Sequence, residues 1–150
     1  MLSNRESVET KLQRIAEKAQ KEPDCQFTSL FHLMDKELLR GCFERLRKDA
    51  ASGIDRVTKE EYGNDLEANL TGLAERLHRM AYIPQPVRRV YIPKPGSTKQ
   101  RPLGIPALED KLVQAGLVRI LEVIYEGDFI DDSYGLDSVR DAAAMTLCAR

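Results

Sequence analysis

The chain has 150 residues, of which 42% are hydrophobic and 31% are charged, and its formal net charge is −1. A chain of this size and composition can bury a hydrophobic core, which excludes disorder, a collagen-like repeat and membrane spanning as descriptions of the whole molecule. The first residues are charged and include no apolar stretch, so we expect no secretory signal. Three widely spaced cysteines without a CxxC pair (Cys25, Cys42 and Cys148) predict free thiols and a cytoplasmic protein.

Two helices are expected in the first third of the chain. Apolar residues at helical spacing predict the first over residues 6–20, and Pro23 ends it. The second begins after Asp35, which is a favourable N-cap residue. The buried face of this second helix is predicted to consist of Leu38, Leu39, Cys42, Phe43 and Leu46. Its opposite face is basic and carries Lys36, Arg40, Arg47 and Lys48.

Two longer helices are predicted beyond residues 51–55 (ASGID), which have the composition of a turn. Thr58 and Glu61 have the spacing of a capping box and predict a helix that runs to about Met80. The buried face of that helix comprises Tyr62, Leu66, Leu70, Leu73 and Leu77. The last helix is expected over residues 108–125. Its predicted buried residues are Leu112, Val113, Leu117, Ile120, Leu121 and Ile124.

Residues 84–106 differ in composition from the rest of the chain, because they hold six of its seven prolines and no acidic residue. Val90 and Ile92 alternate with Arg89 and Tyr91, which predicts a strand, and residues 95–100 (PGSTKQ) predict the turn of a hairpin. The basic residues of this segment are Arg88, Arg89, Lys94, Lys99 and Arg101. In the following residues 107–132, most of the charged side chains are acidic. Charge alone leaves two interpretations open, a phosphate-binding surface or a solvated basic hairpin.

The sequence contains no familiar catalytic motif. The patterns GxSxG, GxxxxGK[ST] and HExxH are absent. His32 and His78 are isolated, and the acidic residues of segment 126–132 lack the ligand order of a calcium loop, so no metal site is predicted. These patterns therefore predict an α+β, helix-rich domain with one basic hairpin as its binding surface, and they leave enzymatic activity open.

Several separated strings in the sequence together resemble one known family. They are GIDRVT, YIPQPVRRVYIPK, QRPLGIP and EGDFIDDSYG, in that order. They resemble the fingers region of bacterial group II intron reverse transcriptases, which are also called intron-encoded maturases. The resemblance extends from about Phe27 to Gly135. It implies an N-terminal helix and linker (1–26), the fingers region of a right-hand polymerase (27–135) and a tail (136–150).

The resemblance also implies roles for the basic residues. Lys94 and Arg101 match fingers residues that contact the triphosphate of the incoming deoxynucleotide, and a guanidinium can hold phosphate oxygens through two donors. The alternative for Arg101 is an ion pair with Glu109 or Asp110. Contacts to template or intron RNA are expected from Arg88, Arg89 and Lys99, with Arg40, Arg47 and Lys48 of the second helix as further candidates.

Two features depart from the family pattern. Arg56 stands in GIDRVT where the family usually has glycine, so a left-handed backbone there would cost energy. The family continues after SYG with FRPGRS, whereas this chain continues with LDSVRDAAAMTLCAR. Permitted codons for that stretch, read in a frame shifted by one base, can spell GFRPGRSSHDALR. We therefore predict that residues 136–150 are an out-of-frame tail.

In the intact family enzyme, palm carboxylates bind Mg²⁺ for nucleotidyl transfer. None of these carboxylates is recognised in this sequence, so we expect the chain to bind no metal and not to polymerise by itself. The expected function is to supply contacts to intron or template RNA and to a deoxynucleotide within an RNA-directed DNA polymerase, without a membrane partner. A non-catalytic RNA-binding module and a decayed remnant without function are the alternatives.

Overall fold

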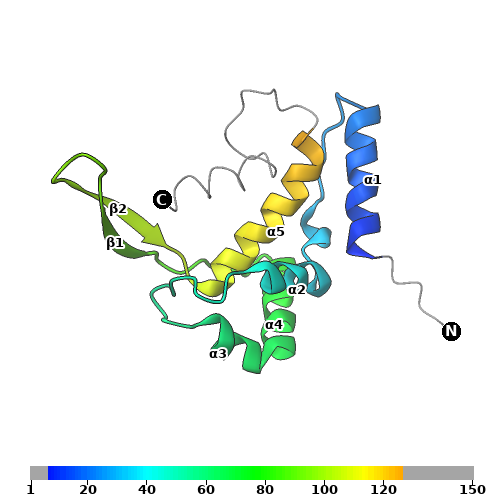
Figure 1. Cartoon of the computed structure of the whole chain (residues 1–150). Coiled ribbons are helices and arrows are strands. Elements are labelled where there is room, and N and C mark those ends of the chain that lie inside the picture. The colour runs from blue at the N-terminus through cyan, green and yellow to red at the C-terminus, as the bar shows by residue number, and fades with distance from the viewer. Residues whose placement is uncertain (1–6, 127–150) are drawn as a thin grey trace. The chain divides into compact units, whose positions relative to one another are not determined.

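The computed structural model describes residues 7–126 (Figure 1). Within these residues it contains five α-helices, one short 3₁₀ helix and a two-stranded antiparallel sheet, which confirms the helix-rich α+β class. The chain divides into two compact units, a first unit of Met1–Leu33 with Gly116–Arg150 and a second unit of Met34–Ala115. The predicted tail at 136–150 and most of the string EGDFIDDSYG lie outside the described residues.

The first unit includes α1 (Val8–Lys21) and η1 (Phe31–Leu33). The side chain of Ser7 caps α1, which is therefore confirmed from Val8 onward. Arg119 donates a hydrogen bond to the Glu9 carboxylate at 3.1 Å, and this contact lies wholly within the first unit. The short helix η1 was not expected from the sequence pattern.

The second unit begins with α2 (Lys36–Arg45), whose cap was predicted correctly. The Asp35 carboxylate accepts a hydrogen bond from the backbone N–H of Leu38 at 2.9 Å. The prediction that Arg47 and Lys48 continue the basic face of this helix is wrong, because the helix ends at Arg45. The buried residues of α2 are Leu38, Leu39, Cys42 and Phe43, whereas Leu46 is half-buried at the C-cap.

The side chain of Lys59 binds the C-terminal end of α2. Its ammonium donates to the carbonyls of Glu44 at 3.1 Å and of Leu46 at 2.6 Å. It also lies 5.1 Å from the centre of the Phe43 ring. A cation that binds the last carbonyls of a helix stabilises the C-terminal end, where the helix leaves those acceptors unpaired.

The expected long helix after residue 58 is two helices, α3 (Lys59–Asn64) and α4 (Leu66–His78). The predicted capping box between Thr58 and Glu61 is confirmed. The prediction of one continuous helix is wrong, because the backbone leaves helical geometry at Asp65. Poor helix formers at residues 63 and 64 precede this break. The Asn69 side chain also donates to the Tyr62 carbonyl at 3.0 Å, in place of a backbone partner.

The buried face of α4 forms the centre of the second unit, where α4 packs against α2. Its buried residues are Leu70, Leu73, Ala74 and Leu77. Leu66, which was predicted to share this face, is half-buried because it is the first residue of the new helix after the break. Tyr62 of α3 is buried as predicted, with its ring 6.0 Å from that of Phe43.

The basic segment forms the predicted hairpin from β1 (Arg88–Pro93) and β2 (Gln100–Ile105). The antiparallel register pairs Arg88 with Ile105 and Ile92 with Arg101. The second strand is longer than the predicted extended run at 103–105, since it starts at Gln100. The ladder continues by one bond toward the turn, where the Lys94 N–H donates to the Lys99 carbonyl at 3.0 Å.

Helix α5 (Leu108–Tyr125) has the bounds predicted from the sequence. Its burial was predicted less well: Leu112 and Ile120 are buried, but Leu117 and Leu121 are 41% and 37% exposed. Apolar residues occupy most of the circumference of this helix, so their periodicity alone does not identify the side that is covered. Among the helices of the described part, none is long and apolar enough to cross a membrane.

Candidate nucleic-acid interface

The hairpin has two chemically different faces, which follow from its register. Side chains alternate between the faces of a strand, and residues that pair directly across an antiparallel ladder share a face. One face, here called the cation face, carries Arg88, Val90, Ile92, Lys94, Lys99, Arg101, Leu103 and Ile105. The other, here called the tyrosine face, carries Arg89, Tyr91, Pro93, Gln100, Pro102 and Gly104. The predicted phosphate ligands are therefore divided between two surfaces.

The three cations nearest the turn lie together on the cation face. Lys94 and Lys99 are the last opposed pair before the turn, and Arg101 is the next residue of that face along β2. All three side chains are exposed, and none has a side-chain partner among residues 7–126. We call Lys94, Lys99 and Arg101 the tip cations. The register thus places Lys99, which was expected to contact RNA, beside the two residues expected to contact a triphosphate.

The turn is built from residues that tolerate its geometry. Gly96 has a φ of 73°, a conformation that favours glycine. The Ser97 hydroxyl accepts a hydrogen bond from the Lys99 N–H at 3.1 Å, and the Lys94 carbonyl accepts one from the Ser97 N–H at 3.1 Å. These local bonds fix the backbone that carries the tip cations without engaging their charged groups.

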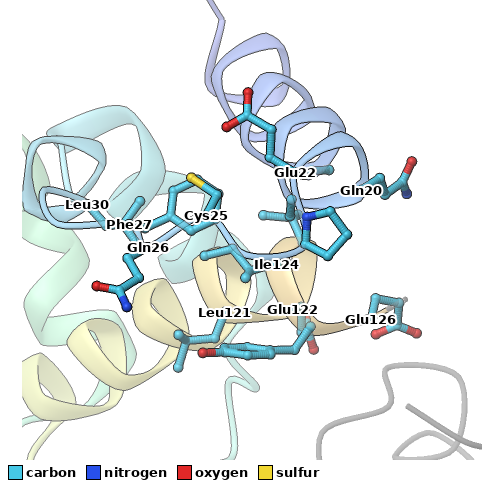
Figure 2. Close-up of a pocket in the computed structure, with 15 residues that line it drawn as sticks. Gln20, Glu22, Cys25, Gln26, Phe27, Leu30, Leu121, Glu122, Ile124 and Glu126 are labelled. Carbon is cyan, nitrogen blue, oxygen red and sulfur yellow. The ribbon is translucent and has the colours of Figure 1, made fainter. Parts of the chain in front are cut away.

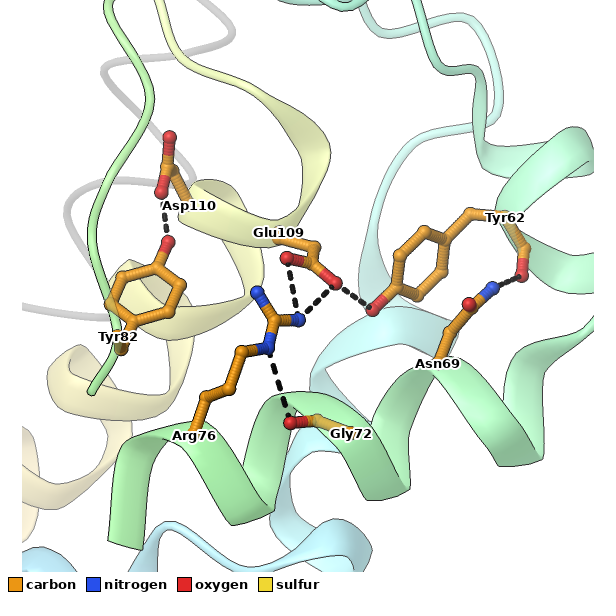
Figure 3. A network of polar contacts seen from close by, with 7 residues as sticks. All are labelled: Tyr62, Asn69, Gly72, Arg76, Tyr82, Glu109 and Asp110. Carbon is orange, nitrogen blue, oxygen red and sulfur yellow. Dashed lines mark hydrogen bonds and ion pairs between the residues drawn. The ribbon is translucent and has the colours of Figure 1, made fainter. Parts of the chain in front are cut away.

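The acidic residues that could have paired with Arg101 have other partners (Figure 3). Glu109 accepts hydrogen bonds from Arg76 at 2.8 and 2.9 Å and from the Tyr62 hydroxyl at 3.1 Å. The buried carboxylate of Asp110 accepts from the Tyr82 hydroxyl and from the backbone N–H of Gln85. The alternative interpretation of Arg101, an ion pair with Glu109 or Asp110, is therefore not observed.

These carboxylates join the first turn of α5 to α4 and to the segment that enters the hairpin. Burial and the charge of Glu109 raise the pKa of Tyr62 above its ordinary value. Burial and the hydrogen bond to Asp110 raise the pKa of Tyr82 in the same way. Both tyrosines thus remain protonated donors at neutral pH. The hydrogen bonds to Glu109 raise the pKa of Arg76, which keeps that guanidinium charged.

Arg88 is used at the base of the hairpin. Its guanidinium donates to the Ser52 carbonyl from two nitrogens, at 2.8 and 3.0 Å. The Lys111 ammonium donates to the neighbouring Ala51 carbonyl. Gly53 lies so close to Ala107 that a Cβ would be 2.5 Å from the Ala107 Cα, so the loop is packed tightly against the start of α5. For Arg88 to contact RNA as expected, its guanidinium would have to give up hydrogen bonds to the Ser52 carbonyl in exchange for a phosphate.

Two of the three predicted RNA contacts near α2 are also engaged. Arg40 pairs with Glu67, which Lys36 contacts at 2.5 Å, and the hydrogen bond from Lys36 lowers the pKa of Glu67. Arg47 pairs with Asp49 at 3.0 Å and lowers the pKa of that carboxyl. Lys48 is exposed beyond the helix. Among the described residues, Arg40, Arg47 and Lys48 therefore do not form one cluster with the tip cations.

A pocket of about 1190 Å³ lies within the first unit (Figure 2). It is formed by the end of α1, residues 22–30 and the end of α5. Its lining is apolar and acidic, and includes Phe27, Ile124 and Glu126. An acidic lining repels phosphate groups, so this pocket is not the candidate nucleic-acid interface.

The described residues also provide no set of metal ligands suited to nucleotidyl transfer. No group of three or more His, Cys, Asp or Glu side chains that could hold a metal occurs in residues 7–126. The residues present therefore do not fit the Mg²⁺ site of the intact family enzyme.

The fold is helix-rich, and its hairpin presents the exposed tip cations, which have no side-chain partner among residues 7–126. Sequence comparison finds relatives that match part of their own length to this chain. The chain is 35% identical to the group II intron-encoded protein LtrA of Lactococcus lactis subsp. cremoris over 130 residues. These 130 residues are 86% of this chain and 22% of the length of LtrA. It is also 46% identical over 88 residues to the protein YkfC of Escherichia coli K12, which is 59% of this chain and 23% of that relative.

The chain is thus homologous to a segment of a group II intron-encoded protein, which confirms the resemblance expected from its motifs. It spans about a fifth of the length of these relatives. No family model matches the chain. The activity, substrates and partners of a whole intron-encoded protein do not follow from this similarity alone.

Proposed function

We propose that the chain is the fingers region of an RNA-directed DNA polymerase of the group II intron type, where it contacts template or intron RNA and the incoming deoxynucleotide. The observation that carries this proposal is the set of tip cations. Lys94, Lys99 and Arg101 are exposed on one face of a hairpin, and the carboxylates of Glu109 and Asp110 are occupied by other donors. The similarity to an intron-encoded protein supports the same assignment.

The tip cations suit phosphate chemistry. A guanidinium offers several donors in one plane, and two ammonium groups beside it add compact positive charge. Phosphates that bind there release counterions, which favours association and makes the affinity depend on salt. Such charges also reduce repulsion within a triphosphate while the nucleotide is positioned. We assign Lys94 and Arg101 to the triphosphate and Lys99, with Arg89, to the RNA backbone.

In this proposal, DNA synthesis depends on protein segments other than residues 7–126. Two-metal nucleotidyl transfer needs carboxylates that hold both ions, and residues 7–126 contain no such group. We therefore propose that this 150-residue polypeptide binds but does not polymerise by itself, and that it acts in the cytoplasm. Primer extension with Mg²⁺ and all the deoxynucleotides is expected to yield no product. Extension that is lost when Arg101 is replaced in the same preparation would contradict this part of the proposal.

Salt-dependent RNA binding tests the assignment of the tip cations. Replacing Lys94, Lys99 and Arg101 together by Ala should reduce the slope of log affinity against log salt for single-stranded RNA by about 0.7, since Lys99 is the one of the three assigned to the RNA backbone and each phosphate contact contributes roughly 0.7. A matched control replaces three exposed cations outside the hairpin, Lys18, Lys21 and Arg79, and should leave the slope nearly unchanged. Equal effects of the two triple variants would contradict the proposal.

A second measurement separates the triphosphate from the RNA. In a polymerase reconstituted with the remaining segments, Arg101→Ala should raise the KM for deoxynucleotide more than the Kd for RNA, because Arg101 is assigned to the triphosphate. Lys99→Ala should have the opposite preference. Equal losses of nucleotide use and RNA binding in both variants would argue against this division of roles.

A further inference from the structure

The tyrosine face of the hairpin contains an exposed aromatic side chain that the proposed phosphate contacts do not explain. Tyr91 is 54% exposed at the middle of β1. Within residues 7–126 its hydroxyl has no hydrogen-bond partner and its ring has no aromatic or cation–π partner. The ring is therefore available on a surface that also belongs to the acid-free segment 84–106.

The residues around Tyr91 form a low, apolar surface with one charge. Pro102 pairs with Tyr91 across the ladder, and Gly104 pairs with the neighbouring Arg89. A Cβ on Gly104 would lie 3.0 Å from the Val87 side chain, so glycine allows this apolar side chain to pack closely beside Arg89's partner in the ladder. Arg89 is exposed and has no partner among the described residues. A planar aromatic group thus lies next to a free guanidinium.

This combination matches the chemistry of single-stranded nucleic acid. Nucleobases stack on exposed aromatic rings, and the adjacent phosphates are held by arginine or lysine. A base that is paired in a duplex is already stacked and cannot use such a ring. Charge complementarity favours a polyanion over an apolar protein partner, because residues 84–106 carry five cations and no acid.

We propose that Tyr91 and Arg89 form a stacking site for an unpaired base of single-stranded RNA, on the face of the hairpin opposite the tip cations. Tyr91 stacks on the base and Arg89 binds the adjoining phosphate. The RNA strand would then contact the tyrosine face while the tip cations remain available for other phosphates. This inference rests on the proposed RNA-binding function and adds a residue and a ligand chemistry to it.

The test compares tyrosine variants of the full 150-residue chain, with a single-stranded RNA that contains 5-iodouridine and a blunt RNA duplex as probes. Tyr91→Leu should weaken binding of the single strand at least about fivefold, with an unchanged salt slope, since a stacked ring but no charge is lost. Tyr91→Phe should retain the affinity. Binding of the duplex should not respond to either variant. Ultraviolet irradiation should cross-link the single strand to the peptide that contains residue 91.

Two control variants separate stacking on Tyr91 from a general effect of losing a tyrosine or a charge. Tyr125→Leu removes a tyrosine of similar exposure, 49%, from the first unit and should leave RNA binding unchanged. Arg89→Ala should lower the salt slope by about 0.7. Unchanged single-strand affinity in Tyr91→Leu would overturn the proposal. A sedimentation change from dimer to monomer in that variant would also overturn it, because the face would then bind a second copy.

The outcomes also distinguish this inference from the proposed function. If the wild-type chain binds RNA and responds to the loss of the tip cations but not to Tyr91→Leu, only the stacking site is wrong. If the wild-type chain shows no salt-dependent RNA binding, the proposed function itself fails.

Discussion

Arg56 has a φ of 58°, in the left-handed region that favours glycine. The family resemblance anticipated this position, since it implies a glycine where Arg56 stands in the motif GIDRVT. The surrounding contacts hold the turn in place. The Arg56 N–H donates to the Gly53 carbonyl at 3.2 Å, and the Asp55 carboxylate accepts from the Val57 N–H at 3.2 Å. The chain therefore keeps the turn geometry despite an unfavourable side chain.

Replacing Arg56 by Gly is expected to stabilise the protein. A left-handed conformation costs a residue with a Cβ about 1–2 kcal/mol, part of which is offset by the greater freedom of glycine in the unfolded chain. The free energy of unfolding, measured by urea denaturation, should rise by about 1 kcal/mol. Arg56→Ala is the control, because it removes the charge but retains the Cβ and should give no such gain. A less stable Arg56→Gly protein would contradict this account of the turn.

The basic residues of the hairpin illustrate what a sequence predicts at the residue scale. Composition identified the cluster, but it could not distinguish the residues that bind the protein's own backbone from those that remain free. Arg88 donates to Ser52, which is remote in sequence, whereas Lys94 and Arg101 have no side-chain partner in the described part. Tyr91 was treated as one residue of an alternating strand. That alternation placed Tyr91 on the same face as Arg89, but its exposure and its pairing with Pro102 come from the structure.

Helix ends in this protein were predicted well where the determining groups are local. The Asp35 cap and the Thr58–Glu61 capping box were correct because both bonds form within one helical turn. The end of α2 and the break at Asp65 were missed, because Lys59 and Asn69 act on backbone carbonyls more distant in sequence. The exposed side of α5 was missed because its apolar residues surround the helix.

The start of α5 depends on two tyrosines whose ionisation should affect stability at alkaline pH. In the folded protein the pKa values of Tyr62 and Tyr82 are raised above the ordinary value of 10.0, by burial and by the carboxylates of Glu109 and Asp110. Well below pH 10 both are neutral in the folded and unfolded states, so their contribution is fully present. As the pH rises above 10 the unfolded chain releases these protons first, which lowers stability.

We therefore expect the urea midpoint to fall between about pH 9 and about pH 11, with the sharper decline above the ordinary tyrosine pKa. The double variant Tyr62→Phe with Tyr82→Phe should show a smaller decline, although its stability at neutral pH is lower because two hydrogen bonds are lost. Tyr91→Phe is the control, since that side chain is exposed. The expectation fails if the buried and exposed variants have the same alkaline profile.

At the scale of the whole molecule, the second unit carries the hairpin and the polar contacts that hold its base. Those contacts are made by α4, the loop at 51–53 and the first turn of α5, all between residues 34 and 115. The proposed RNA and nucleotide contacts therefore belong to one compact unit. The acidic pocket belongs to the first unit, and its lining includes none of the residues proposed to contact RNA or nucleotide.

The family relationship leads to a prediction about residues 136–150, which lie outside the described structure. A reading frame shifted by one base takes the last base of each codon with the first two bases of the next. The junction of Met145 and Thr146 then gives GAC for Asp without any codon freedom, as the motif GFRPGRSSHDALR requires. The other positions of the motif each need one of the codons permitted for this sequence. We expect the gene to spell this motif in the shifted frame.

Sequencing the gene across these codons is the measurement. The shifted frame should encode Gly-Phe-Arg-Pro from the codons beginning at Leu136, and removal of a duplicated GGATT near the Gly135 codon should restore the continuation SYGFRPG. Arg and Ser side chains would then replace the residues of LDSVRD and the alanine-rich stretch that follows it. The choice among synonymous codons is informative. An unrelated tail would have no reason to use the particular third bases that the motif needs in the shifted frame. Codons that spell another peptide in the shifted frame would refute the out-of-frame interpretation while leaving the tip cations and the tyrosine face unaffected.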